Sequence, residues 1–497
     1  MRAPVLVGVS LFAVAPLAAQ ERVDASMLAK IRAEGFERSH VVQMFDTIAT
    51  VFGPRLTGSA AFLRAANYAR QKFSESGARD AHLEAWPFGR GWELDRFSIE
   101  MIEPRYAPLL GYPEAWSPST LGEIVAAPVF TAGKSATEVE SLAPKLKGGI
   151  LMQQGLMSNF IMTDRPQPTD PTARSAVAPD PAGRQNYCLP RPPAAAGGRG
   201  GQSADGARIT QLLNDAWPAI RLSATRGLHG SLFLQGGRYN ASPRSTNIVL
   251  AAEHYNMIVR LLENAVPVTL RVNSQSRFTT RDTNGYNIIA EIPGTDPRLR
   301  DQVVMAGAHL DSWHSSLGAA DNADGAAVML EVMRILKAVG AQPRRTIRIA
   351  LWGGEEEGLL GSCAWTRQHL SADSAARGHL SLYLNMDPGT GPIYGFYMEG
   401  SESAKAIFDA WLEPFRDLGY RKNLISGMGN TDHLSFIAQG VPGFNPIQEY
   451  TDYDTRIHHT NWDSPERVPV DGLKSAAVIY AALLYHAAMR DEMMPRK

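Results

Sequence analysis

Several side chains of this sequence are of the types that bind metal ions, and most of them follow directly on an apolar stretch or a tight turn. Carboxylates that meet in a protein interior repel one another and are costly to desolvate unless a positive charge lies between them. Two imidazoles and three carboxylates are enough for two divalent ions that share one carboxylate and keep positions open for water. The candidates are His309, Asp321, Glu356, Asp387 and one of the adjacent histidines His458 and His459.

Two apolar strands are predicted to lead into the first of these groups. Residues 303–306 form a continuous apolar run, which is typical of a strand buried on both faces, and His309 follows shortly after it. Residues 344–352 carry apolar side chains at alternate positions and lead to Glu355 and Glu356. In an open α/β sheet a pocket forms where the strands end, so we expect these groups at the same edge.

A helix and a third strand complete the predicted frame. The helix runs from about Ala326 to Val339 and has polar side chains on one stripe only, so the rest of its surface is expected to pack on the sheet. Leucines alternate with polar residues over 380–385, and Asp387 comes soon after them. The sequence therefore predicts an α/β fold whose strand ends carry the candidate ligands.

Taken in this order, the motifs resemble the co-catalytic zinc exopeptidases, which include bacterial leucyl aminopeptidases and glutamate carboxypeptidases. The motifs are His-x-Asp at 309–311, Asp-Asn-x-x-Gly at 321–325 and Glu-Glu-x-Gly-Leu-x-Gly-Ser at 355–362, and the resemblance covers roughly residues 53–77 and 287–468. The His-Leu-Asp-Ser-Trp sequence and the paired histidines are most similar to the carboxypeptidase Q branch. The resemblance implies a mixed central sheet flanked by helices, with an inserted β-rich domain of the protease-associated type.

The resemblance also implies which residues bind metal. Asp321 matches the ligand that bridges two zinc ions, with His309 and Asp387 on one ion and Glu356 and His459 on the other. His459 is chosen over its neighbour because the family pattern places the histidine four residues before an aspartate, which here is Asp463.

Two further residues take catalytic roles by the same resemblance. Glu355 matches the general base, which takes a proton from the attacking water and returns it to the leaving amine. Asp311 matches the carboxylate behind His309 and would fix the tautomer of that imidazole. One departure is Asp324, which stands where Ser, Thr or Gly is common in the family and adds a negative charge near the bridging ligand.

The activity implied is hydrolysis of a terminal peptide bond in a peptide or dipeptide, and the resemblance also implies a homodimer. Two alternatives share the fold. A glutaminyl cyclase generally uses one zinc ion, so the full set of ligands favours the peptidase. A binding scaffold like the transferrin receptor is expected to lack several of these ligands, all of which are present here.

The chain is expected to contain two or three units, because 497 residues exceed one ordinary domain. Residues 1–20 have the basic start, short apolar core and small-residue end of a secretory signal peptide. Residues 21–121 and 276–497 are expected to form the catalytic domain. Between them, 122–275 would form the insert, with a mobile excursion over 166–206 that is rich in Pro, Gly, Ala and Arg.

Composition limits the partners and the location of the protein. A formal net charge of -1 gives no electrostatic reason to expect nucleic acid as a partner. No stretch beyond the signal is apolar and long enough to be expected to span a membrane. We therefore expect an exported enzyme, either periplasmic or secreted.

Three further expectations concern residues outside the predicted site. Arg55 lies in a Gly-Pro-Arg-Leu-Thr-Gly-Ser loop and is assigned a structural role, with a position near substrate as the alternative. Residues 230–234 are expected to form a strand of the insert. Cys188 and Cys363 belong to different predicted units, so two unpaired thiols are expected.

Overall fold

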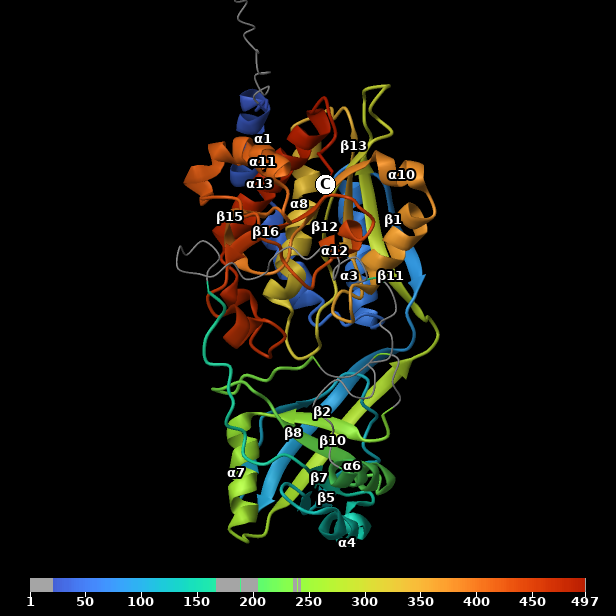
Figure 1. The fold of residues 1–497 in the computed structure, drawn as a ribbon, viewed down its shortest axis with the longest axis vertical. Helices are drawn as coiled ribbons and strands as arrows, with labels where there is room; N and C mark the ends of the chain where they lie inside the picture. Colours follow the sequence, from blue (N-terminus) through green and yellow to red (C-terminus); the bar gives the residue numbers. More distant parts are fainter. Residues whose placement is uncertain (1–20, 167–187, 189–203, 236–238, 240–242, 497) are drawn as a thin grey trace, which may run out of the picture.

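The computed structural model describes residues 21–166, 188, 204–235, 239 and 243–496. The chain forms two lobes, which are seen one above the other in Figure 1. The predicted signal peptide and most of the predicted excursion over 166–206 lie outside the described residues.

The upper lobe is built on a seven-stranded mixed sheet with the order β1-β11-β13-β12-β14-β16-β15. The four central strands β13, β12, β14 and β16 run parallel, while β1, β11 and β15 are antiparallel to their neighbours. The predicted α/β fold with a mixed central sheet is confirmed. The strands are β1 (Arg79–Pro87), β11 (Asn284–Ile292), β12 (Val303–His309), β13 (Thr346–Trp352), β14 (Leu380–Asn385), β15 (Thr390–Tyr397) and β16 (Gly443–Glu449).

Side chains alternate between the two faces of this sheet, and each face is covered by helices. In β12, Val304 and Ala306 belong to the larger core, whereas Met305 packs on the opposite face with Trp365. The larger core includes α1 (Ala25–Glu37), α2 (Val41–Asp46), α3 (Ala60–Glu75), α8 (Asp324–Ala338), α11 (Glu402–Leu412) and α13 (Val470–Met489). The opposite face is covered by α9 (Leu360–Thr366), η3 (Arg367–Ser371) and α12 (His433–Ile437).

Helix α13 is long and apolar enough to cross a membrane by length and composition, but it lies inside the upper lobe. Most of its side chains are buried, and it packs against α8 and β15. It is the core helix that the apolar spacing over 471–489 predicts. The shorter elements around these helices are η1 (Thr47–Val51), η2 (Ala319–Ala323), α10 (Ser374–His379), η4 (Glu413–Leu418), η5 (Tyr453–Ile457) and η6 (Pro465–Arg467).

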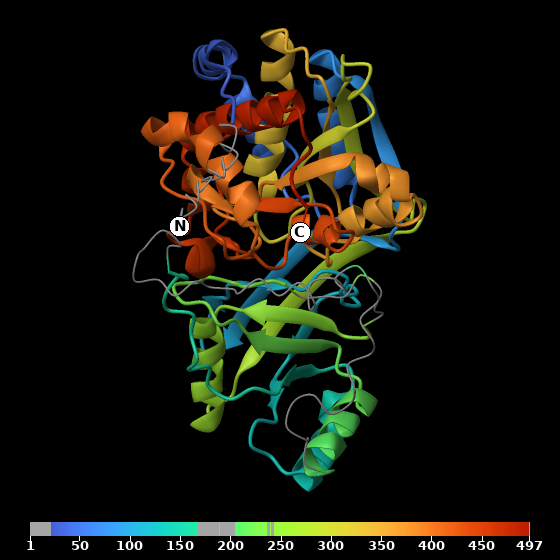
Figure 2. The ribbon, with the colours of Figure 1, turned by 45° about the horizontal axis from the view of Figure 1, so that its top comes forward.

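In the part of the chain that the structure describes, the lower lobe contains two sheets and three helices, which are seen in Figures 1 and 2. One sheet has the order β3-β2-β10-β5, with β3 (Ala107–Pro108), β2 (Gly91–Glu103), β10 (Thr269–Thr279) and β5 (Ile124–Ala126). The other has the order β4-β9-β8-β7-β6, with β4 (Gly111–Pro113), β9 (Thr246–Leu250), β8 (Ile220–Ala224), β7 (Ile150–Met152) and β6 (Pro128–Phe130). The helices are α4 (Ala136–Leu146), α6 (Ala204–Asp215) and α7 (Ala252–Glu263).

Strands β2, β3 and β4 come before residue 122, where the insert was predicted to begin, yet they pair with strands that follow it. Strand β2 pairs with β10 along eleven register positions, and β4 pairs with β9. The division of the chain at 121 and 275 therefore stays a prediction, and these pairings favour an earlier start for the lower lobe.

Two of the smaller predictions are wrong. Cys188 and Cys363 form a disulfide, so they are not free thiols, and this bond ties a residue of the predicted insert to α9 of the upper lobe. Residues 230–234 form no strand, because the backbone there makes only one antiparallel bridge, between Phe233 and Thr460.

Candidate active site and metal centre

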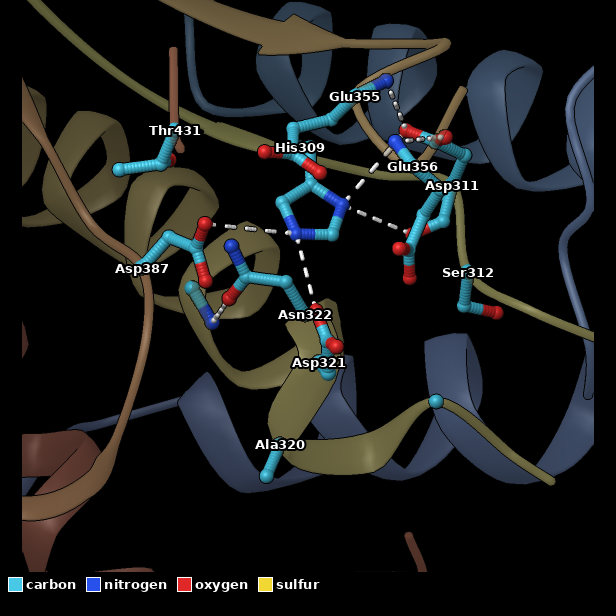
Figure 3. Close-up of polar contacts among 12 residues, drawn as sticks. His309, Asp311, Ser312, Ala320, Asp321, Asn322, Glu355, Glu356, Asp387 and Thr431 are labelled. Carbon is cyan, nitrogen blue, oxygen red and sulfur yellow. Dashed lines mark hydrogen bonds and ion pairs between the residues drawn. The ribbon is translucent and has the colours of Figure 1, made fainter. Parts of the chain in front are cut away.

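The first half of the candidate site lies where β12 and β14 end at one edge of the sheet (Figure 3). His309 is the last residue of β12, and Asp387 follows β14 by two residues. His309 Nε2 lies 3.2 Å from Asp321 Oδ1 and 3.8 Å from Asp387 Oδ2. All three side chains are buried, and their ligand atoms lie within 4.8 Å of one another. This spacing suits a single cation held between them.

The second half of the site uses the other oxygen of the same aspartate. His459 Nε2 lies 3.3 Å from Asp321 Oδ2 and 2.8 Å from Glu356 Oε2. Asp321 therefore presents one carboxylate oxygen to each histidine, which is the arrangement of a ligand that bridges two ions. The structure brings the five predicted ligands together, although they come from five separate segments of the chain.

The chemistry of these groups fits a divalent metal. Among the described residues, His309 Nε2, Asp321 Oδ2 and Glu356 Oε2 are buried and make no hydrogen bond. Burial and the neighbouring Asp321 raise the pKa of Glu356 well above its ordinary value, against the effect of His309. Buried polar atoms without partners are costly, and a cation between them would satisfy them. Imidazole nitrogens and carboxylate oxygens are ligands that zinc accepts.

Glu355 is buried beside the ligands, and the two candidate metal-binding groups of the described residues contain neither it nor Glu356. Burial raises its pKa well above the ordinary value, and the carboxylates of Asp387, Asp432 and Glu356 add to this rise, whereas His309 opposes it. A carboxylate whose pKa is raised above its ordinary value is suited to accept a proton and give it back.

Asp311 contacts both His309 and the loop that carries the two glutamates. His309 Nδ1 makes a hydrogen bond of 3.0 Å with the backbone carbonyl of Asp311, and the carboxylate lies 3.6 Å from the same nitrogen. The carboxylate accepts the backbone N–H groups of Glu355 and Glu356, each at 3.3 Å, and the hydroxyl of Thr57 at 3.1 Å. Asp311 thus fixes the ring of the histidine and the start of the glutamate loop together.

Comparison with known proteins agrees with this geometry. Residues 287–484, which contain all five candidate ligands, match the sequence profile of peptidase family M28. Over these residues the chain is similar to peptidase family M28. It is a hydrolase of peptide bonds, as the motifs of the sequence imply.

Some of the similar proteins match nearly the whole chain, and others match only part of it. Human carboxypeptidase Q is 25% identical over 474 residues, which are 95% of this chain and 89% of the relative. Leupeptin-inactivating enzyme 1 of Streptomyces exfoliatus is 35% identical over 166 residues, 33% of this chain and 36% of the relative. A peptidase M28 precursor from Shewanella amazonensis SB2B has the same fold, with a TM-score of 0.68 and 21% identity over 95% of this chain and 98% of that chain.

A zinc aminopeptidase from Bacillus subtilis also shares the fold of this chain, with a TM-score of 0.57 and 18% identity. The match covers 91% of this chain and 95% of that chain.

Asp463 helps to hold the bridging ligand in place. Its carboxylate accepts the backbone N–H groups of Ala320 at 2.7 Å and Asp321 at 3.1 Å. Burial and the charge of Asp321 raise the pKa of Asp463 to about 7, while those two hydrogen bonds and Arg55 oppose the rise. In the sequence, Asp463 only identifies His459 through the spacing of the family motif. In the structure, Asp463 also contacts the backbone of the turn that carries Asp321.

Arg55 lies in the loop for which the sequence leaves a structural role and a position near substrate as alternatives. Its guanidinium is fully buried and donates to the carbonyls of five residues rather than to a carboxylate. Burial lowers its pKa to about 10, and the nearby carboxylates, Asp463 first, oppose this shift. The bonds tie the end of β12 to the turn before the bridging ligand, so the structure places Arg55 in a structural role. The acceptors are Ile48, Gly53, Leu310, Leu317 and Gly318.

Two other side chains lie close to the candidate metal centre. His458 stacks on His459 with ring centroids 3.7 Å apart and forms a second candidate group with Asp321 and His459. Asp324 is buried at the start of α8. Burial raises its pKa well above the ordinary value, and the carboxylates of three neighbouring aspartates add to the rise against a backbone hydrogen bond from Gly325. The departure at Asp324 therefore does place an acidic group beside the bridge.

Proposed function

We propose that this chain is an exported metalloexopeptidase that holds two zinc ions and cleaves the terminal bond of peptides or dipeptides. One observation carries the proposal, namely that the two oxygens of Asp321 face two different histidines at 3.2 and 3.3 Å. Carboxypeptidase Q, similar over 95% of the chain, and the zinc aminopeptidase of the same fold support this assignment.

In this proposal His309 and Asp387 hold one ion, Glu356 and His459 hold the other, and Asp321 bridges them. Zinc ions held there would act as Lewis acids that acidify the attacking water and polarise the scissile carbonyl.

Glu355 is the group that moves the proton. It lies next to Glu356 in the chain, and its side chain is buried beside His309. In the proposal it takes a proton from the attacking water at its carboxylate and delivers it to the leaving amine. Asp311 keeps His309 in the tautomer whose Nε2 faces the carboxylates, because its carbonyl accepts at Nδ1.

Export is supported by two features. The first twenty residues have the composition of a secretory signal. The Cys188–Cys363 disulfide is of a kind that persists in oxidising compartments. A homodimer belongs to the same proposal by resemblance to carboxypeptidase Q, and light scattering of the purified protein would measure it.

The function is tested by a screen of the purified enzyme with and without a chelator. Dipeptides with a free amine, peptides with a blocked amine and amino-acid anilides are compared, and zinc is added back after chelation. We expect cleavage of at least one class of terminal bond, loss of activity with chelator and its return with zinc. Activity that survives full removal of metal would contradict the proposal, and metal analysis of the same samples would give the number of ions.

A further inference from the structure

The metal ligand His459 lies on a loop that the lower lobe holds in place. Its backbone has a φ of 57°, a left-handed conformation that is uncommon for a residue with a side chain. The backbone N–H of Leu234 donates to the carbonyl of His459 at 3.0 Å. Phe233 forms an antiparallel bridge with Thr460, the next residue along. The unusual conformation is therefore fixed by a chain segment from the other lobe.

Further contacts from the lower lobe continue on the same side of this loop. The N–H of Leu232 donates to the side-chain oxygen of Asn461 at 2.7 Å, and the N–H of Asn461 donates back to the carbonyl of Leu232 at 3.3 Å. These reciprocal bonds lie two residues beyond His459. They leave the segment 232–235 no freedom to shift along the loop without breaking both.

A second segment of the predicted insert holds the turn that precedes the ligand. The carboxylate of Asp164 accepts the backbone N–H of Asp452 at 2.8 Å and that of Thr455 at 2.9 Å. Arg165 forms an ion pair of 2.5 Å with Asp454 in the same turn. The loop with the paired histidines is thus held by residues 164–165 before the ligand and by residues 232–235 after it, and both segments lie outside the catalytic sheet.

One side chain of the lower lobe reaches the imidazole itself. The side-chain amide of Gln235 contacts Nδ1 of His459 through its nitrogen Nε2, whereas Nε2 of His459 faces Asp321 and Glu356. An imidazole that binds a metal through Nε2 carries its proton on Nδ1 and needs an acceptor there. A half-turn of the glutamine amide exchanges its nitrogen and oxygen, which differ little in shape, and places the carbonyl oxygen at Nδ1 as that acceptor.

We infer that Gln235 is a positioning residue for the metal centre, which accepts the Nδ1 proton of His459 and so keeps Nε2 free to bind an ion. The inference rests on the proposed two-zinc site. It assigns part of the metal centre to the lower lobe, which acts on one of the two ions through the histidine that binds it. The corresponding partner of His309 is the carbonyl of Asp311, which belongs to the catalytic sheet itself.

The test measures the zinc dissociation constants of the full-length protein by competition with a chelator. The variant Gln235→Met keeps the length of the side chain and removes the acceptor, and Gln235→Glu restores an acceptor. Gln235 is exposed, so both variants are expected to fold. Gln153→Met, an exposed glutamine elsewhere in the insert, is the matched control. Titrations are repeated in about 0.5 M salt, which screens the charge that Gln235→Glu adds at the surface.

We expect Gln235→Met to weaken binding of one zinc ion by roughly 10–100-fold and to leave the other unchanged. Gln235→Glu should recover most of that loss at both salt concentrations, and the control should match the wild type. Unchanged affinities in Gln235→Met, or a Gln235→Glu variant as weak as Gln235→Met, would overturn the inference while the two-zinc site stands. A wild-type protein that binds fewer than two ions would overturn the proposed function and this inference with it.

Discussion

The two halves of the proposed metal centre are built in different ways. His309 and Asp387 lie at the ends of adjacent parallel strands, where the register of the sheet fixes their positions. Glu356 and His459 lie on loops, and the side chain of His459 keeps 14% of its surface exposed, compared with 1% for His309. One half is therefore as rigid as the core, whereas the other depends on contacts from a second lobe. We expect the second half to be the more easily disturbed.

The largest effect should come from the residue that joins the halves. Asp321→Asn keeps the shape of the side chain but removes the charge and one of the two acceptor oxygens. Both ions should be lost, and activity should fall by at least about 10³-fold, since Lewis-acid stabilisation contributes several kcal/mol. Zinc analysis and steady-state kinetics measure this, with the exposed Asp205→Asn as control. A variant that keeps one ion at full affinity would show that the halves are independent.

Glu355→Gln should separate chemistry from metal binding, because Glu355 is assigned to neither half. We expect both ions to stay bound while turnover falls by about 10²–10⁴-fold, the usual range for loss of a general base. Turnover at the wild-type rate with zinc retained would remove Glu355 from the mechanism.

Substitutions of the histidines compare the two halves of the site directly. His309→Ala and His459→Ala should each lose one ion, but only His309→Ala should lower the free energy of unfolding of the metal-free protein by about 2 kcal/mol or more, because its side chain is buried in the core. His458→Ala should keep both ions. Zinc content and urea unfolding give the two readouts. If His458→Ala loses an ion and His459→Ala does not, the two neighbours have been assigned in the wrong order.

A smaller effect should report on the junction of the lobes near the first half. The buried ring of His314 donates from Nε2 to the carbonyl of Pro113 at 2.7 Å, and burial lowers its pKa to about 4 against that hydrogen bond. The unfolded chain binds this proton near its ordinary pKa of 6.5. Stability from this group is therefore complete above that value and is lost as the pH falls toward the folded pKa.

For the metal-free protein, the loss from this group should be about 2 kcal/mol between pH 7 and pH 5. His314→Gln keeps a donor and cannot be protonated, so its unfolding free energy should fall less over the same interval. Equal pH dependence in both proteins, measured by urea unfolding, would mean that His314 does not titrate as its burial implies.

The sheet half of the site could be predicted from the sequence for a physical reason. A continuous apolar run can only be a buried strand or helix, and its length and its polar end place His309 at the edge of a sheet. The same holds for Asp387 after the alternating leucines. Glu355 and Glu356 follow in the same way from the strand at Thr346–Trp352.

The histidine of the loop half could not be derived from periodicity. His459 lies in a loop, its backbone is in the left-handed conformation, and the sequence around it has no strand or helix pattern. Only the spacing to Asp463 in the family motif therefore distinguishes it from His458. The pairing of Cys188 with Cys363 and the contacts of residues 232–235 join segments far apart in the chain. Local patterns carry no signal for such contacts.

Anomalous scattering at the zinc edge, from crystals of the zinc-loaded protein, tests most directly whether Asp321 bridges two ions. We expect two peaks about 3.5–4 Å apart. One should lie next to His309 and Asp387 and the other next to Glu356 and His459, with an oxygen of Asp321 bound to each. A single peak in this site, or two peaks of which one is not bound by Asp321, would contradict that bridging role.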